Sequence, residues 1–197
     1  MVDLGLRQVS LVLFDGFELL DATGPLEVFG QVGDRVGVTL VGPRSGPVAS
    51  SQGIRLMADV AYAGAPAPDI VLVPGGSGTR ALAGDRDWLA WLAAWAGPAR
   101  LVASVCTGAA LLAAAGLLDG HRATTNRRAA DWVAGLGPGV TWVQDARWVE
   151  DGDRWTSAGV SAGLDMALAL TATLWGQAAA DAAAAAMEYG WMATPCG

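Results

Sequence analysis

The stretch Leu101-Val-Ala-Ser-Val-Cys106-Thr-Gly-Ala-Ala-Leu-Leu112 joins an apolar run directly to a run of helix-forming residues. The residues before the cysteine are compact or β-branched, which is typical of a buried strand, and residues 109–118 are mostly strong helix formers. The small residues Ser104, Thr107 and Gly108 permit a sharp turn between strand and helix. The spacing repeats the nucleophile elbow of G-x-S-x-G hydrolases, with sulfur in place of oxygen.

Two interpretations of Cys106 follow from this stretch. At the turn its thiol would face the positive end of the following helix, which favours the thiolate and lowers the pKa. Alternatively, Cys106 is a buried structural residue in an ordinary strand-helix unit, since unpaired cysteine is among the most buried residue types. The stretch alone leaves both interpretations open.

Further apolar runs bounded by turn residues predict the rest of the fold. We expect strands at 9–14, 36–41, 69–74, 140–149 and 154–158, two short extended pieces at 48–57, and helices at 26–32, 87–95, 109–118, 127–136, 161–175 and 177–189. Strands that alternate with helices imply an α/β fold, with a mostly parallel sheet between two helical layers. Neither a linker nor a repeat divides the chain, so we expect one domain over residues 1–197.

The carboxyl ends of the predicted strands carry the chemically interesting residues. Ligands of such sheets bind beyond these ends. Asp21, the pair Gly75 and Gly76, Cys106 and the segment 157–163 all follow predicted strands. We therefore expect four loops to converge on one site.

Composition narrows the class of protein. The 197 residues are 53% apolar with a net charge of −7, and no basic cluster could track phosphates, so a nucleic-acid partner is not expected. Cys106 and Cys196 are far apart, which suits a reducing compartment, and we expect neither a metal site nor a cofactor. The chain has no apolar run of membrane-spanning length and no secretory signal pattern, so we predict a soluble, cytoplasmic protein.

The possible proton carriers near Cys106 are few. The single histidine, His121, would lie beyond the following helix, about 18 Å long for twelve residues, which disfavours a Cys-His enzyme. Asp21, buried beside a thiolate, would have a raised pKa and could act as a general acid. Equally, it could simply be a carboxylate at a helix start, near a Thr23 cap.

Two further features could assist a reaction at the sulfur. The Thr107 hydroxyl could donate to a substrate or orient water. The backbone N–H groups of Gly75 and Gly76 could stabilise developing negative charge, as oxyanion donors do. A tight turn alone would also explain the two glycines.

Five motifs together resemble the ThiJ/PfpI family. They are Leu20-Asp-Ala-Thr-Gly-Pro25, Val73-Pro-Gly-Gly76, Ser104-Val-Cys-Thr-Gly108, Ala123-Thr-Thr125 and Ser157-Ala-Gly-Val-Ser-Ala-Gly-Leu-Asp165. They follow the order and spacing of the family, and the resemblance extends over about residues 9–189. The resemblance implies the class I glutamine amidotransferase-like fold, a flavodoxin-like three-layer α/β/α sandwich. Within the family, the combination of Asp with Cys-Thr is similar to the isonitrile hydratases.

The resemblance also implies roles for single residues. Cys106 would be the nucleophile, Asp21 the general acid/base and Thr107 the residue required beside the nucleophile, while Gly75 and Gly76 would form the backbone loop that faces the cysteine. The expected reaction adds water to a small isonitrile, without a cofactor, in a homodimer. Asn126 replaces a histidine of the similar hydratases, and the C-terminal end also differs, so the substrate range can differ.

Other functions and interfaces remain open at this level. A ligand- or redox-sensing domain and another thiol hydrolase or glyoxalase-like lyase are the alternatives. Trp88, Trp91 and Trp95 share one helical face, which predicts core or a subunit interface, and the alanine-rich final helix could also pair two subunits. Cys196 is expected to be an exposed bystander.

Overall fold

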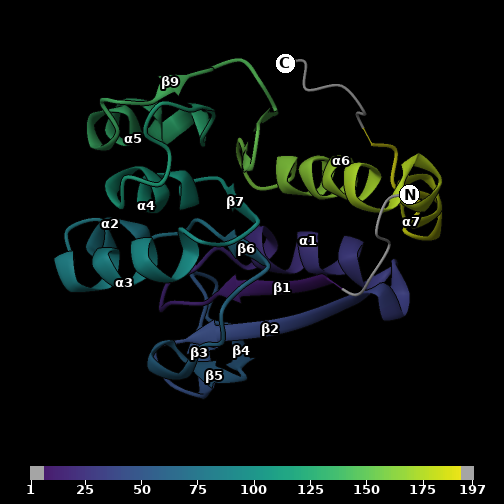
Figure 1. Cartoon of the computed structure of the whole chain (residues 1–197), viewed down its shortest axis with the longest axis horizontal. Helices are drawn as coiled ribbons and strands as arrows, with labels where there is room; N and C mark the ends of the chain where they lie inside the picture. The colour runs from purple at the N-terminus through teal and green to yellow at the C-terminus, as the bar shows by residue number, and fades with distance from the viewer. Residues whose placement is uncertain (1–6, 192–197) are drawn as a thin grey trace.

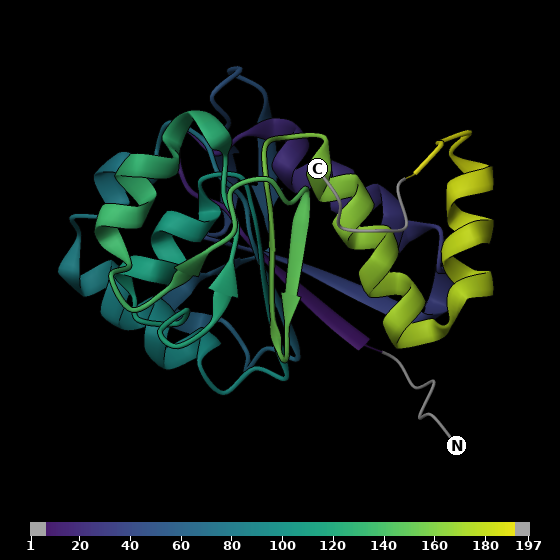
Figure 2. The same cartoon turned by 90° about the horizontal axis from the view of Figure 1, so that it is seen from above.

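The computed structural model describes residues 7–191, in which a central sheet lies between two layers of helices (Figures 1 and 2). Within this range the main sheet has seven strands, in the order β10 (Trp148–Asp151), β11 (Arg154–Ser157), β7 (Leu101–Val105), β6 (Ile70–Val73), β1 (Arg7–Val12), β2 (Val36–Gly42) and β5 (Val60–Ala61). Every neighbouring pair is parallel except the β10-β11 hairpin. The predicted α/β class with a mostly parallel sheet is confirmed.

Seven α-helices cover the sheet within residues 7–191. They are α1 (Leu19–Gly30), α2 (Thr79–Leu82), α3 (Arg86–Ala96), α4 (Gly108–Ala114), α5 (Ala130–Leu136), α6 (Ala162–Trp175) and α7 (Gln177–Ala186). Figure 2 shows α1, α6 and α7 on one side of the sheet and α2 to α5 on the other. Of these helices, none is long and apolar enough to cross a membrane.

Shorter elements complete the described chain. Three 3₁₀ turns lie at η1 (Gly33–Arg35), η2 (Tyr62–Gly64) and η3 (Arg127–Ala129), and small two-stranded sheets form from β3 (Gly46–Ala49) with β4 (Arg55–Ala58) and from β8 (Arg122–Ala123) with β9 (Thr141–Trp142). The β3-β4 pair confirms the extended pieces expected outside the main sheet. The strand expected over 140–149 is shorter: only its two ends are extended, as β9 and the start of β10.

The strand register brings the predicted loops together. In β6 and β7 every residue is buried, because helices cover both faces of the sheet. Val73 pairs with Ser104, and Val105 pairs with Ser157. The segments that follow β6, β7 and β11 therefore leave the sheet side by side, as the sequence predicted.

Helix α1 differs from the prediction. It begins at Leu19 rather than at residue 26, so Asp21 lies in its first turn and not in a loop. The Thr23 hydroxyl does not cap the helix but donates to the Leu19 carbonyl at 2.9 Å, one turn earlier. Pro25 is tolerated inside the helix, although it has no N–H to donate to the Asp21 carbonyl.

Helix α4 is also shorter than the 109–118 prediction. It ends at Ala114 because Gly116 adopts a positive φ of 74°. The Gly116 and Leu117 amides then donate to the carbonyls of Ala113 and Leu112, at 2.9 Å each. This is a Schellman stop, in which a glycine closes the helix.

Helix α3 contains the predicted tryptophan face, and that face packs on its own chain. Trp88 is buried, and the indole N–H groups of Trp91 and Trp95 donate to the carbonyls of Tyr62 and Pro66, at 3.2 and 2.8 Å. Trp91 and Trp95 stack with ring centroids 5.1 Å apart. The structure therefore supports the core interpretation of this face.

Asp85 caps α3, because its carboxylate accepts from the Trp88 amide at 3.0 Å. We expect Asp85→Ala to lower the free energy of unfolding by about 1 kcal/mol, the usual contribution of such a cap. The matched variant Asp87→Ala removes the same charge from the first turn of α3 but no capping hydrogen bond, so it should cost less. Urea denaturation of both proteins tests this, and equal losses would contradict the capping role.

Candidate active site

Cys106 stands at the turn between β7 and α4 in a conformation that L-residues rarely adopt, with φ at 58°. Its backbone is held on both sides: its N–H points at the carbonyls of Ser157 and Ala158, each at 3.0 Å, and its carbonyl accepts from the Thr125 hydroxyl at 2.9 Å. Such strain persists only where the surroundings enforce it. The predicted nucleophile elbow is therefore present.

Gly108 allows the elbow to form against β6. A Cβ at this position would lie 2.2 Å from the Val73 carbonyl oxygen, so no larger residue fits without a shift of backbone. The start of α4 thus rests directly on the end of β6. This contact explains why a small residue follows the cysteine by two positions.

The sulfur of Cys106 lies among hydrogen-bond donors and one carboxyl group. The Asn126 amide nitrogen donates to Sγ at 3.2 Å, and the backbone N–H groups of Thr107 and Val160 also point at the sulfur. Asn126 is fixed in this orientation, because its Oδ1 accepts from the Arg128 amide at 2.9 Å. Cys106 is a free cysteine with 6% of its surface exposed.

Asp21 lies in the first turn of α1 and is fully buried. Its carboxyl group is close enough to the Cys106 thiol for its charge to raise the pKa of the thiol. Its Oδ2 accepts from the Gly75 amide at 2.9 Å, and within residues 7–191 its Oδ1 has no partner of hydrogen-bond geometry. The pKa of Asp21 is raised from 3.8 to about 7. Burial is the largest cause and the charge of Glu18 acts in the same direction, while hydrogen bonds from the Gly75 amide and the Cys106 thiol partly oppose the rise. The predicted rise is confirmed.

The pKa of Cys106 corrects the sequence-based expectation. Burial, together with the negative charge of Asp21, raises the pKa of the thiol from 9.0 to about 11. The donors at Thr107, Asn126 and Val160 lower the pKa but do not outweigh these two causes. The expected lowering by the following helix is wrong, because desolvation of a thiolate and repulsion from a neighbouring carboxylate cost more than the helix start contributes.

Gly75 keeps Asp21 and Thr107 close together. A Cβ on Gly75 would lie 2.6 Å from both the amide and the hydroxyl oxygen of Thr107, and 2.8 Å from Asp21 Oδ2. The Thr107 hydroxyl accepts from the Gly76 amide at 3.0 Å and lies 3.2 Å from the Thr79 hydroxyl. In this state both glycine amides are thus engaged within the protein, where they position Asp21 and Thr107.

His121 lies apart from this cluster. Its Nδ1 is 3.1 Å from an oxygen of Asp151 on β10, and the same carboxylate accepts from the Arg122 amide. Among residues 7–191, no group of His, Cys, Asp and Glu side chains is arranged to hold a metal ion. Cys196 lies outside the described residues.

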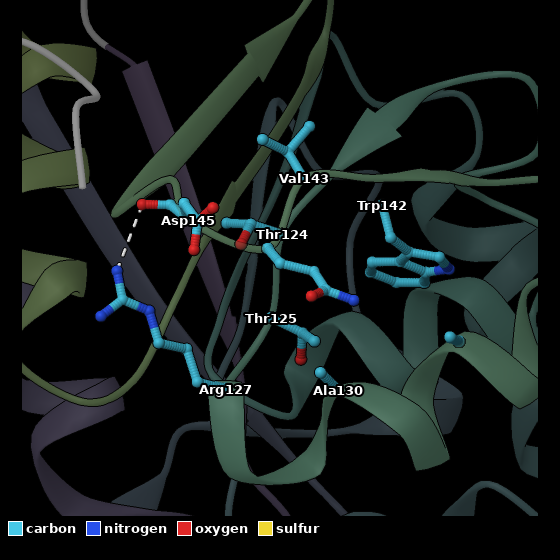
Figure 3. Close-up of a pocket in the computed structure, with 9 residues that line it drawn as sticks. Thr124, Thr125, Arg127, Ala130, Trp142, Val143 and Asp145 are labelled. Atoms are coloured by element: carbon cyan, nitrogen blue, oxygen red, sulfur yellow. Dashed lines mark hydrogen bonds between the residues drawn. The ribbon is translucent and has the colours of Figure 1, made fainter.

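Two cavities flank the segment that carries Asn126. The first, about 170 Å³, has Trp142 and Arg127 on opposite sides, with Thr124 and Thr125 between them (Figure 3). The second, about 270 Å³, is lined by Asn126, Arg127, Arg128, Arg147, Ala158, Gly159 and Ala162. Asn126 thus lies between the sulfur and an open space large enough for a small molecule.

Several residues at this site escaped the sequence analysis. Asn126 was expected as a departure from the family, yet it donates to the sulfur. Thr125 and Val160 stand in quoted motifs but were given no role, and Thr79 was not singled out, because their roles depend on contacts between distant segments. The predicted segment 157–163 does reach the site, through the carbonyls of Ser157 and Ala158 and the amide of Val160.

Comparison with known proteins identifies the family. Residues 7–173 match the DJ-1/PfpI family, and the chain belongs to it. The chain is 40% identical to an isonitrile hydratase of Pseudomonas putida, over 92% of this chain and 78% of that protein. The resemblance to the ThiJ/PfpI family is confirmed.

Two further relatives show how the domain is used elsewhere. A crystal structure of a ThiJ/PfpI family protein from Pseudomonas syringae superposes with a TM-score of 0.86 at 34% identity, covering 94% of this chain and 76% of that one. The HTH-type transcriptional regulator GbdR of Pseudomonas aeruginosa is 31% identical over 83% of this chain and 46% of its own length. Relatives therefore include both an enzyme and a regulator.

The raised pKa of Asp21 predicts a pH-dependent stability. The folded protein holds this proton up to about pH 7, whereas the unfolded chain releases it near 3.8, so the residue destabilises the fold increasingly as the pH rises between these values. Asp21→Asn cannot titrate and escapes this cost. The free energy of unfolding of Asp21→Asn minus that of wild type should therefore be about 3 kcal/mol larger at pH 8 than at pH 5, so the variant gains relative stability as the pH rises. Urea denaturation at both pH values measures this, and an unchanged difference would refute it.

The same substitution should lower the pKa of Cys106, because it removes the negative charge that helps to raise it. The rate of Cys106 alkylation by iodoacetamide at pH 8 should rise, about tenfold for each unit by which the pKa falls. Peptide mass spectrometry separates Cys106 from Cys196. Asp181→Asn, an exposed change on α7, should leave the rate at the wild-type value, and a slower reaction in Asp21→Asn would count against the coupling.

Proposed function

We propose that this protein hydrates isonitriles to N-substituted formamides, with Cys106 as the nucleophile and Asp21 as the proton carrier. The observation that carries the proposal is the buried thiol-carboxyl pair, in which the pKa of Asp21 is about 7 and no imidazole takes part. The similarity to an isonitrile hydratase over most of the chain supports the same reaction. The steps below need only this chain and water.

The first half of the reaction forms a thioimidate. The thiol proton passes to the Asp21 carboxylate as the sulfur attacks the terminal isonitrile carbon, and Asp21 then gives that proton to the same carbon. The product is an R–N=CH–S linkage to Cys106. Because the thiol is neutral in the resting site, Asp21 acts as a base before it acts as an acid, unlike the thiolate attack expected from sequence.

The second half releases the formamide. Asp21 accepts a proton from water as the oxygen attacks the thioimidate carbon, and returns it to the nitrogen, giving R–NH–CH(OH)–S. The hydroxyl proton then moves to the sulfur as the carbon-sulfur bond breaks. Overall, one isonitrile and one water give one formamide, and both Cys106 and Asp21 return to their starting states.

Five residues would support these steps without exchanging protons. The Asn126 amide and the Thr107 and Val160 N–H groups stabilise negative charge on sulfur as the thiol proton leaves. Gly75 holds the Asp21 carboxyl through its amide, and Gly76 fixes the Thr107 hydroxyl. The oxyanion role predicted for the two glycine amides would require them to exchange these partners, so positioning is the role that we propose.

The alternatives differ in what they require of the thiol. Oxidation of a cysteine by peroxide needs thiolate character, and a thiol whose pKa is raised to about 11 has little of it near neutrality. This disfavours a redox sensor.

A homodimer remains a prediction, since nothing in a single chain tests it.

The test is turnover of several aryl and alkyl isonitriles by the purified protein, with formamide as the measured product. We expect Cys106→Ala to abolish formamide formation and Asp21→Asn to reduce kcat/KM by about a hundredfold or more. Wild-type kcat/KM should rise with pH through about 7, as Asp21 becomes a carboxylate, and this dependence should vanish in Asp21→Asn. Cys196→Ser is the matched cysteine control and should retain activity.

Two outcomes would overturn the proposal. Either the wild type forms no formamide from any isonitrile, or formamide formation survives in Cys106→Ala. Methylglyoxal serves as the competing substrate, because Cys106-dependent consumption of it without isonitrile turnover would assign the site to a glyoxalase-like lyase. Circular dichroism of each variant shows that the fold is retained.

A further inference from the structure

The larger cavity beside the active site is rich in arginine. Arg127, Arg128 and Arg147 all line it, together with Asn126, Ala158 and smaller residues. The chain as a whole is acidic, with a net charge of −7 and only 12 basic residues. A quarter of its basic residues therefore gather on this one cavity.

Two of these three arginines carry uncompensated charge. Arg147 forms an ion pair with the buried Asp165, which neutralises it. Arg127 donates to the backbone carbonyl of Asp145 at 3.2 Å, which satisfies one N–H group but supplies no negative charge. Within residues 7–191, no carboxylate lies within ion-pair distance of Arg127 or of Arg128.

The cavity and the sulfur share their walls. Asn126 lines the cavity and places its amide nitrogen 3.2 Å from Cys106 Sγ. Ala158 also lines the cavity, and its carbonyl accepts from the Cys106 amide at 3.0 Å. A group bound at Arg127 or Arg128 would therefore lie next to the reacting sulfur, on the far side of a single side chain.

We propose that Arg127 and Arg128 form a carboxylate-binding subsite, and that the preferred substrate is an isonitrile with a carboxylate on its organic group. This inference rests on the proposed function for the isonitrile part alone. Guanidinium groups bind carboxylates through paired N–H donors, and no carboxylate of the described chain forms an ion pair with either of these two. The isonitrile end would lie at the sulfur, and the carboxylate end would lie on the open, cationic side of Asn126.

The charged substrate is tested against its neutral ester. We compare 4-isocyanobenzoate with methyl 4-isocyanobenzoate, and isocyanoacetate with its methyl ester, in wild type, Arg127→Gln, Arg128→Gln and the double variant. The wild type should have a lower KM for each carboxylate than for its methyl ester. Arg127→Gln and Arg128→Gln should each raise the KM for the carboxylates by about fivefold, with little change in kcat. The esters should be unaffected.

The matched control is Arg100→Gln, an exposed arginine immediately before β7, at the opposite end of the strand from Cys106. It removes the same charge and should leave all four substrates unchanged. The subsite would be overturned if the wild type had equal KM values for acid and ester. It would also be overturned if the arginine variants raised the KM for acid and ester by the same factor.

A second measurement tests the subsite without any isonitrile turnover. Iodoacetate and iodoacetamide alkylate the same Cys106 sulfur, but only iodoacetate is an anion. The ratio of their rates at Cys106 should exceed the ratio for free cysteine, and should fall about fivefold in the double variant but not in Arg100→Gln. An unchanged ratio in the double variant would refute the subsite. If no isonitrile reacts while the ratio falls as expected, the proposed function fails and the carboxylate subsite stands.

Discussion

The strained backbone of Cys106 is the constraint on which the site depends. A φ of 58° is costly for a non-glycine residue, by about 1–3 kcal/mol, and the cost is offset by hydrogen bonds to two other segments of chain. One segment carries Ser157 and Ala158 at the end of β11, which pairs with β7, and the other carries Thr125 after β8, so the ends of β11 and β8 together enforce the elbow. Because Gly108 has no Cβ, α4 can start against the Val73 carbonyl and leave the sulfur at the end of the sheet.

Burial then decides the chemistry of the thiol-carboxyl pair. Desolvation is the largest cause of the raised pKa at both Asp21 and Cys106. The charge of Asp21 raises the pKa of Cys106 further, whereas the hydrogen bond from the thiol lowers the pKa of Asp21. At neutral pH such a site therefore holds a neutral thiol rather than a thiolate. The thiol lies beside a carboxyl group whose pKa is about 7, so this group can accept or donate a proton near neutrality. The proton can therefore move from sulfur to carboxylate and on to carbon without crossing solvent, which suits a reaction that adds one proton and removes another.

The sequence predicted the architecture and the main site residues, because these depend on local patterns. Apolar runs defined β1, β2, β6 and β7, and the alternation with helices implied which strand ends would meet. It misplaced Asp21 in a loop, since the Thr23-Gly-Pro25 signal resembles a helix start although α1 already begins at Leu19. It also predicted the wrong direction for the pKa of Cys106, because the depth of burial is set by packing between segments that no single stretch of sequence shows.

Asn126 lies between the Cys106 sulfur and the cavity lined by Arg127 and Arg128. One side of its amide is fixed by the Arg128 N–H and the other donates to the sulfur, so the residue that caps the start of η3 also places a hydrogen-bond donor at Cys106. Arg127 and Arg128 follow Asn126 directly in η3, so the turn that Asn126 caps also positions the two arginines at the cavity. Because the amide of Asn126 is uncharged, the positive charge beside this part of the site comes from the arginines that line the cavity, while a hydrogen-bond donor stays at the sulfur.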